Sequence, residues 1–371
     1  FLLPVWLLRG KHVLKHELAI RCQLDPALLP YNSDFLGFLR SEHANGRKLY
    51  LVTGAYKTVA QSIANHLEFF SDVFATDEHT NLTGERKALL LIEKFGKNGY
   101  DYAGNDDVDH VVWSEAKACY LVNATPAAAA RAKQRINFSG EMDLRKGFSL
   151  GNFLKAIRLH QWAKNALVFV PLLASHHMMD MEKLADVVLA FLAFGCCASF
   201  SYVANDIADL DADRLHHNKR KRPFASAVIS IPSGFLLGIM LISVTAMLAC
   251  FLPPAFVYAL LAYFIVTNIY TLRLKAVPIL DVAILAGLYA LRVLAGGFAA
   301  DVPASFWLLA FSCFIFFSLA IVKRVSELMG IETPDEKAVV CRGYRTSDMP
   351  VLTGLGTSSA LMAVLVMALY I

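Results

Sequence analysis

Long uncharged runs dominate the chain from about residue 163 onward, and they restrict its fold more than any other feature. Most of them are long enough to cross the roughly 30 Å of hydrocarbon in a bilayer. Backbone groups in lipid must be hydrogen-bonded internally, so we expect each run to be a helix. We therefore predict an all-α bundle of seven membrane spans, the first of them short, over residues 165–175, 184–204, 225–252, 255–272, 276–300, 302–322 and 351–371.

Basic residues are distributed unevenly between the two sides of these spans. The connections after the second, fourth and sixth spans carry five, two and five Lys or Arg residues, whereas the opposite connections carry only Lys183. Because cytoplasmic connections are enriched in Lys and Arg, we predict a multi-pass protein with residues 205–224, 323–350 and the N-terminal region on the cytosolic side. The twelve residues are Arg214, Lys219, Arg220, Lys221, Arg222, Arg273, Lys275, Lys323, Arg324, Lys337, Arg342 and Arg345.

Four acidic residues lie within eight positions where the second predicted span ends. If this stretch is helical, Asp206, Asp209 and Asp213 share one face. Carboxylates this close need a counter-charge, and Mg²⁺, which takes oxygen ligands from one or two carboxylates and from substrate phosphates, is the expected one. The alternative is an ordinary charged connection whose basic residues only set the topology. In the first interpretation the basic residues that follow contact phosphate oxygens directly: Lys219, Arg220, Lys221 and Arg222.

Ionisable residues inside membrane spans are costly and usually functional. Asp281 and Arg292 are eleven residues apart in one span, close to three helical turns, so they should share a face that points into the bundle. They form either part of a substrate site or a mutual ion pair that holds the bundle together. Other polar residues stand at the span ends: Gln161, Lys164 and Asn165; Tyr270 and Lys275; and Lys323, Arg324 and Glu327, of which Lys323 and Glu327 could simply pair.

Residues 1–130 have a different character, because charged and apolar residues are mixed as in a globular domain. Short apolar runs at 49–53, 72–75, 100–103 and 119–122 alternate with helical patterns at 58–70 and 85–95 and a helical turn at 109–116. This alternation predicts a parallel α/β sheet with ligands at the carboxyl ends of its strands. Residues 131–154 are predicted to be a linker, and residues 155–371 the membrane domain.

Three polar elements follow strands or open a helix in this first domain. Thr53 closes one strand, Lys87 opens a helix, and an acidic loop with Asn105, Asp106 and Asp109 follows a later strand. Together they predict a phosphate-binding site whose acidic loop could hold Mg²⁺.

The order and spacing of these elements resemble those of the haloacid-dehalogenase-like phosphatases. The resemblance implies a Rossmannoid fold and a phosphatase site. The Asp-x-Asp nucleophile motif of that family is missing before Thr53, and position 105 is Asn where the family commonly has Asp. We expect the nucleophile upstream of Phe1, and the present residues predict no phospho-aspartyl intermediate. A structural domain without activity is the alternative.

The second half resembles the UbiA superfamily of intramembrane prenyltransferases, whose first Asp-rich motif matches Asn205-Asp206-x-x-Asp209-x-x-x-Asp213. A finer match is to the branch of decaprenyl-phosphate phosphoribosyltransferases, through the segments that begin at Arg158, Asp213, Tyr270, Leu280 and Lys323. The superfamily usually has a second acidic motif after the fourth span. Here the basic residues Arg273 and Lys275 stand at that place, and Asp281 is the acid that follows. The resemblance implies nine spans, so we expect two beyond Ile371.

The resemblance to this branch implies a Mg²⁺-dependent transfer of phosphoribosyl from phosphoribosyl pyrophosphate to a polyprenyl phosphate. The alternatives are prenyl transfer from a prenyl diphosphate to an aromatic or small acceptor, and a membrane transporter or lipid-binding protein without chemistry. No nucleic-acid partner is predicted at a net charge of +4. The implied catalytic residues are Asp206, Asp209, Asp213 and Asp281, of which the first three hold the metal. The implied substrate-binding residues are Asn205, Gln161, Lys164, Asn165, Lys219, Arg220, Arg222, Tyr270, Lys275, Arg292, Lys323 and Arg324.

Overall fold

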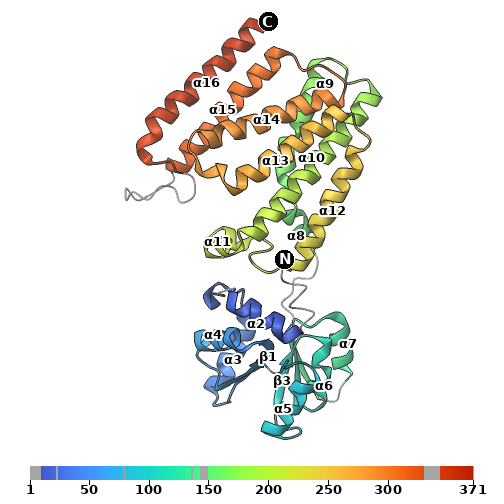
Figure 1. The fold of residues 1–371 in the computed structure, drawn as a ribbon, viewed down its shortest axis with the longest axis vertical. Helices are drawn as coiled ribbons and strands as arrows, with labels where there is room; N and C mark the ends of the chain where they lie inside the picture. Colours follow the sequence, from blue (N-terminus) through green and yellow to red (C-terminus); the bar gives the residue numbers. More distant parts are fainter. Residues whose placement is uncertain are drawn as a thin grey trace. The chain divides into compact units, whose positions relative to one another are not determined.

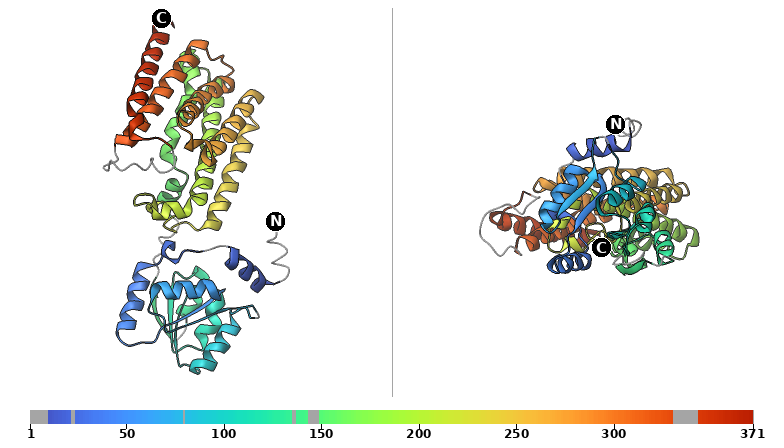
Figure 2. Two further views of the ribbon diagram at one scale, coloured as in Figure 1. Left: turned by 60° about the vertical axis from the view of Figure 1, so that its left-hand side comes forward. Right: turned by 90° about the horizontal axis from the view of Figure 1, so that it is seen from below.

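The computed structural model describes residues 10–21, 24–78, 80–134, 137–142, 149–329 and 343–370. The chain divides into two compact units, Phe1–Gly147 and Phe148–Ile371. Figure 1 labels the elements of both units, and Figure 2 shows them from two further directions. Each unit has its own hydrophobic core, so each is described by itself.

The first unit alternates strands and helices, as the sequence predicts. Its strands are β1 (Tyr50–Tyr56), β2 (Asp72–Thr76), β3 (Asp101–Gly104), β4 (Ala118–Val122) and β5 (Phe138–Met142). Its helices are α2 (Lys11–Arg21), α3 (Ser33–Ala44), α4 (Lys57–Leu67), α5 (Glu85–Phe95), α6 (His110–Ser114) and α7 (Pro126–Lys133), with 3-10 turns η1 (Pro26–Leu28) and η2 (Asp107–Asp109).

All strand pairs described in this unit are parallel, but they form two sheets. β1 pairs with β2, and β4 lies between β3 and β5. The four predicted strands are therefore present within a residue or two, except that β1 runs on to Tyr56. Residues 138–142 were predicted to be linker and instead form β5, because their backbone completes the hydrogen bonding of β4. Trp113, Cys119 and Leu121 are fully buried in the core of the unit.

The second unit is all-helical, as predicted. Among the described residues, six helices are long and apolar enough to cross a membrane. They include α10 (Met181–Ala208), α12 (Ile231–Ala249), α13 (Pro254–Leu272), α14 (Leu280–Ala299), α15 (Phe306–Met329) and α16 (Met349–Tyr370). The shorter elements are α8 (Leu150–Ala156), η3 (Leu159–Phe169), α9 (Val170–Ala174), α11 (Leu210–Leu215), η4 (Lys219–Lys221), η5 (Leu274–Ala276) and η6 (Thr346–Asp348).

The prediction of seven spans is not met, because the first predicted span is not a membrane-length α-helix. Residues 159–169 form the 3-10 helix η3, and α9 continues for only five residues. Two side chains of η3 form hydrogen bonds to other helices. Trp162 donates to Ser199 Oγ at 3.0 Å, and Asn165 accepts from Arg292 at 2.9 Å. These contacts hold η3 against its neighbours. An α-helix has more residues per turn than a 3-10 helix, so it would point these side chains in other directions.

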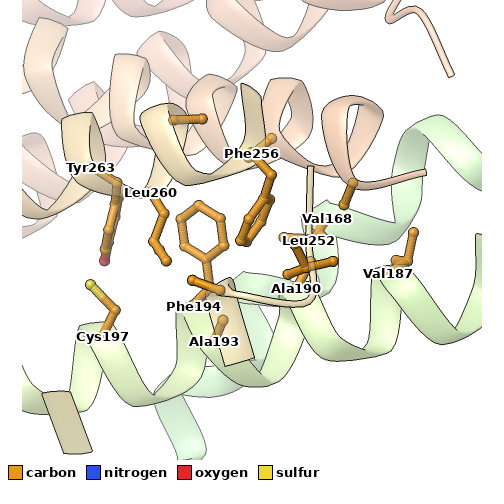
Figure 3. Packing of buried hydrophobic residues seen from close by; sticks show 14 of the residues in the cluster. Val168, Val187, Ala190, Ala193, Phe194, Cys197, Leu252, Phe256, Leu260 and Tyr263 are labelled. Atoms are coloured by element: carbon orange, nitrogen blue, oxygen red, sulfur yellow. The ribbon is translucent and has the colours of Figure 1, made fainter. Parts of the chain in front are cut away.

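Aromatic packing joins α10 to α13 in the core of the second unit. Phe194 of α10 points toward Phe256 and Leu260 of α13 (Figure 3). Its ring centroid lies 5.7 Å from that of Phe256 and 5.1 Å from that of Tyr263, both edge-to-face. Edge-to-face pairs of this kind stabilise beyond their buried area. In Figures 1 and 2, α16 runs beside α15, and α12 runs beside α10.

Candidate active site

The acidic stretch folds around a helix break. α10 ends at Ala208, Asp209 stands at the junction, and α11 begins at Leu210. The three carboxylates therefore do not lie on one continuous helix. Asp206 and Asp213 are nevertheless brought together, since each is only 2% exposed and each accepts from the same atom, Arg222 Nη1, at 3.1 and 2.5 Å.

Arg158 is a second arginine in this cluster and contacts the same Asp206 oxygen as Arg222. Its Nη2 donates to Asp206 Oδ1 at 2.5 Å, and its guanidinium lies 4.9 Å from the ring centroid of Tyr202. It occupies the junction between α8 and η3 with a left-handed backbone (φ 50°). The sequence-based site residues omit Arg158 and Tyr202. Arg158 could have been predicted, because it begins one of the segments on which the family resemblance rests, three residues before Gln161.

The remaining members of the acidic stretch lie further out. Asp209 is half-buried, and its carboxylate is 3.9 Å from Lys275 Nζ of η5. Asp211, the fourth acid of the stretch, is exposed and lies 3.9 Å from Arg214. Three basic residues of η4 are exposed: Lys219, Arg220 and Lys221.

A second buried cluster surrounds Asp281 at the start of α14. Arg324 of α15 donates to Asp281 Oδ2 at 2.7 Å, and Tyr344 donates to Asp281 Oδ1. Arg324 also donates to Glu327 at 2.6 Å and to the Tyr270 hydroxyl at 3.5 Å. Burial and the hydrogen bond to Asp281 raise the pKa of Tyr344 above its ordinary value. Tyr344 was missed because no sequence pattern links a tyrosine after the sixth span to an acid in the first turn of the fifth.

Of the two alternatives for Asp281 and Arg292, the mutual ion pair is wrong. Both side chains point into the bundle, as expected, and both are buried. Arg292, however, donates to Asn165 Oδ1 and to the Tyr263 hydroxyl, each at 2.9 Å. Its guanidinium also lies 4.7 and 5.2 Å from the ring centroids of Tyr263 and Tyr289. Eleven residues of helix cover about 16 Å, so the two ends of α14 have separate partners.

The other predicted substrate-binding residues line the same helices. Gln161 and Lys164 are half-buried on η3, and Asn205 is half-buried on α10 directly before Asp206. Lys323 is exposed on α15, beside the buried Arg324. Lys337 and Arg342, which contribute to the predicted charge asymmetry, lie outside the described residues.

The predicted phosphate-site residues of the first unit line one cavity of about 260 Å³: Thr53, Lys87, Asn105, Asp106 and Asp109. Lys87 Nζ donates to Asp109 Oδ1 at 2.9 Å and to the Tyr102 hydroxyl at 2.8 Å, while that hydroxyl donates to Asp109 at 3.0 Å. Burial, followed by the Asp109 charge, raises the pKa of Tyr102 above its ordinary value. Tyr102 is absent from the predicted set, although it precedes the acidic loop on β3.

The carboxylates of the second unit fit a divalent cation in part. Within the described ranges, no group of three or more His, Cys, Asp or Glu side chains is arranged to hold a metal ion. Asp206 and Asp213 nevertheless both point a carboxylate oxygen at one cationic atom, Arg222 Nη1. Carboxylate oxygens are hard ligands. Mg²⁺ is commonly held by one or two carboxylates and completed by substrate phosphates. The pair therefore suits a metal that arrives with an anionic substrate.

Residues 166–371 match the model of the UbiA prenyltransferase family. Over 369 residues the chain is 33% identical to the uncharacterised protein y4nM of Sinorhizobium fredii, covering all of this chain and 71% of that one. It is also 33% identical over 192 residues to a decaprenyl-phosphate phosphoribosyltransferase of Mycolicibacterium smegmatis, covering 51% of this chain and 60% of that one.

Among solved structures, the chain is similar to a UbiA homologue from Archaeoglobus fulgidus bound to DMAPP and Mg²⁺. The sequence identity is 22% and the TM-score 0.46, over 57% of this chain and 76% of that one. The family match covers more than half of the chain, and the first relative spans all of it. The predicted alternative of a transporter without chemistry is therefore set aside. The chain belongs to the UbiA prenyltransferase family and is a membrane transferase.

Proposed function

We propose that the second unit transfers a phosphoribosyl group from phosphoribosyl pyrophosphate to a polyprenyl phosphate. The observation that carries this proposal is the set of cations around the acidic pair. Arg158, Arg222 and Lys275 come from three separate connections and approach Asp206, Asp213 and Asp209. A reaction between two phosphate-bearing substrates needs this density of positive charge. The similarity to the phosphoribosyltransferase of M. smegmatis supports the same substrates.

Asp206 and Asp213 would hold Mg²⁺ together with the donor diphosphate, with Asp209 as a further ligand. A divalent metal held there would supply stabilisation of the negative charge on the departing diphosphate. Arg158 fixes the Asp206 carboxylate, because its own position is set by the Tyr202 ring and the turn before η3. Arg222 and Lys275 can donate to phosphate oxygens, and such contacts strengthen as charge develops in the transition state.

In the proposed reaction the bond between the anomeric carbon and the diphosphate oxygen breaks. An oxygen of the lipid phosphate forms the new bond to that carbon. The lipid phosphate is already anionic and needs no general base. The exposed Lys219 and Arg220 of η4 are suited to attract it, while the apolar helices around them accommodate the polyprenyl chain.

The test is a donor assay on the purified full-length protein with radiolabelled phosphoribosyl pyrophosphate and polyprenyl phosphate. We expect Asp213→Asn to reduce transfer roughly a hundredfold, in the range found when one transition-state contact is removed. Asp211→Asn is the matched control, because Asp211 is exposed and should leave the rate unchanged. Equal rates in the two variants would contradict the proposal.

Prenyl transfer is the second candidate, because the matching family model describes prenyltransferases. It predicts that a prenyl diphosphate, and not phosphoribosyl pyrophosphate, is consumed in the same assay. The Asp281 cluster bears on this choice, since Asp281 is engaged by Arg324 and Tyr344. Asp281 is therefore already hydrogen-bonded, and the connection after α13 carries Lys275. This connection offers a cation, whereas a second metal ion would need carboxylates.

For the first unit we propose a haloacid-dehalogenase-like phosphatase that removes the 5-phosphate from the product. Thr53, the Lys87–Asp109 pair and the backbone of the acidic loop line one small cavity, a size that suits a phosphate. Asn105 and Asp106 direct their backbone N–H groups to Asp109 Oδ2 at 3.2 and 3.3 Å, which holds the loop closed around that acid.

The phosphatase proposal is tested by analysing the lipid product of a full-length protein that contains an Asp-x-Asp nucleophile. Loss of the 5-phosphate in that protein, and its retention after Lys87→Met, would support it. Lys94→Met, on the exposed side of the same helix, is the control. Persistence of the phosphorylated lipid in the unaltered protein would contradict the phosphatase proposal and leave the transferase proposal untouched.

A further inference from the structure

Arg222 stands at the point where the two buried carboxylates meet. A single atom, Nη1, lies 3.1 Å from Asp206 Oδ1 and 2.5 Å from Asp213 Oδ2. The two acids come from different helices, α10 and α11, and each carboxylate is 3% exposed. Without a cation between them, two buried carboxylates this close would repel each other strongly.

Arg158 differs from Arg222 in how it is held. Of the two acids, Arg158 pairs within the described residues with Asp206, and its guanidinium lies 4.9 Å from the ring centroid of Tyr202. Arg222 follows the exposed turn η4 and keeps 28% of its side chain exposed. The Arg158 side chain is also partly exposed, at 21%, but the Tyr202 ring restrains it. Arg222, which follows the exposed turn η4, is the arginine that can leave the pair by turning toward solvent.

We infer that Arg222 is an internal counter-ion that fills the cation position between Asp206 and Asp213 until a divalent metal displaces it. This inference rests on the proposed metal site and adds an exchange step to it. A metal bound between Asp206 Oδ1 and Asp213 Oδ2 would occupy the position of Arg222 Nη1, so binding there requires Arg222 to move. The released guanidinium, with its planar fork of donors, is then free to bind the donor diphosphate.

Two consequences follow from the exchange. The apparent metal affinity is the intrinsic affinity multiplied by the fraction of molecules in which Arg222 has left the site. Metal and diphosphate should also bind cooperatively, because the diphosphate offers Arg222 a new partner and so favours the open arrangement. Arg222 thereby ties opening of the acidic pair to arrival of the donor.

Mn²⁺ binding to the chelator-treated full chain in detergent, followed by the loss of the free-ion EPR signal, tests the inference. We expect Arg222→Gln to bind Mn²⁺ at least about tenfold more tightly than the unaltered protein. Arg214→Gln is the matched control, because it removes the same charge from the same connection but faces the exposed Asp211. Its Mn²⁺ affinity should change by less than about threefold, because Arg214 is half-buried but its ion pair is with the exposed Asp211, at 3.9 Å, and not with the acidic pair.

Thermal unfolding of the same samples gives a second readout. Arg222→Gln should melt below the unaltered protein in chelator and should gain more from Mn²⁺, because the ion replaces the missing counter-charge. If Arg222→Gln cannot be purified, Arg222→Lys is the second variant. It keeps the positive charge but loses the planar guanidinium that can donate to two carboxylates at once. It should also bind Mn²⁺ more tightly than the unaltered protein.

The outcomes separate this inference from the proposed function. If Arg222→Gln binds Mn²⁺ no more tightly while Asp213→Asn loses binding, the exchange is overturned and the metal site stands. If the unaltered protein binds no Mn²⁺, or Asp213→Asn binds it equally well, both the metal site and the exchange are overturned. An equal gain in Arg214→Gln would also overturn the exchange, because it would show a general charge effect.

Discussion

Arginines and tyrosines organise the polar interior of the membrane unit. Arg292 is buried among two tyrosine rings and Asn165, and Arg324 is buried between Asp281, Glu327 and Tyr270. A guanidinium suits such places because it offers several fixed donors and stacks on aromatic faces. Asp281 thus belongs to a buried salt-bridge cluster, which offsets the cost of placing its charge in a membrane span.

Asp281→Asn should destabilise the protein because it leaves Arg324 buried with a weaker partner. Removing one member of a buried ion pair costs about 3–5 kcal/mol in soluble proteins, so we expect a drop of several degrees in the melting temperature in detergent. Asp301→Asn, at an exposed position with φ 49° that Asn tolerates well, serves as the control. An unchanged melting temperature for Asp281→Asn would show that Arg324 does not depend on this carboxylate.

The helix η3 illustrates how packing overrides an apolar run. Its backbone lies directly against α14, so that a Cβ atom built on Gly296 would stand only 1.9 Å from the carbonyl oxygen of Val168. Glycine is required there because no side chain fits between the two backbones. This close approach fixes η3 and its residues Gln161, Lys164 and Asn165 beside the site.

Gly296→Ala should therefore push α14 away from η3 and lower stability by about 1–3 kcal/mol or more, as overpacking does. Gly287→Ala on the same helix is the matched control, since nothing lies within 4 Å of its added Cβ. There the better helix propensity of alanine should leave stability equal or slightly higher. Melting temperatures of the two variants in one detergent make the comparison, and equal losses would refute the close-packing argument.

The ends of α10, α13 and α15 gather at one end of the membrane unit. Asp209 after α10 reaches Lys275 after α13, and Tyr344 after α15 accepts from the backbone N–H of Ile279 at 2.7 Å. The three basic connections predicted to share one side are thus joined by contacts. The positive-inside rule predicts that this side faces the cytosol.

Trypsin cleavage of membrane vesicles checks this orientation. The exposed Lys219, Arg220 and Lys221 should be cut in inside-out vesicles and protected in right-side-out vesicles. Lys183 lies on the opposite side in the predicted topology and is the internal control, with the reverse pattern expected. Cleavage at η4 from the outside would invert the predicted orientation and the placement of the proposed site.

Local patterns were enough for most of the fold. The apolar runs gave six of the seven predicted spans, because a helix in lipid needs little more than length and hydropathy. Strand–helix alternation gave β1 to β4, and the spacing of polar residues after strands gave the cavity residues Thr53, Lys87 and Asp109. β5 was missed because it depends on pairing with β4, and isolated strands have weak local signals.

Contacts between residues far apart in the chain were decided only by tertiary structure. The sequence placed Asp206, Asp213 and Arg222 in one stretch, but the helix break at Asp209 determines that one guanidinium joins the two acids. The partners of Asp281 and Arg292 lie up to 127 positions away in the chain, so helix periodicity gave their shared face but not their contacts. Periodicity is a property of one helix, whereas the choice of a partner depends on which other helices pack against it.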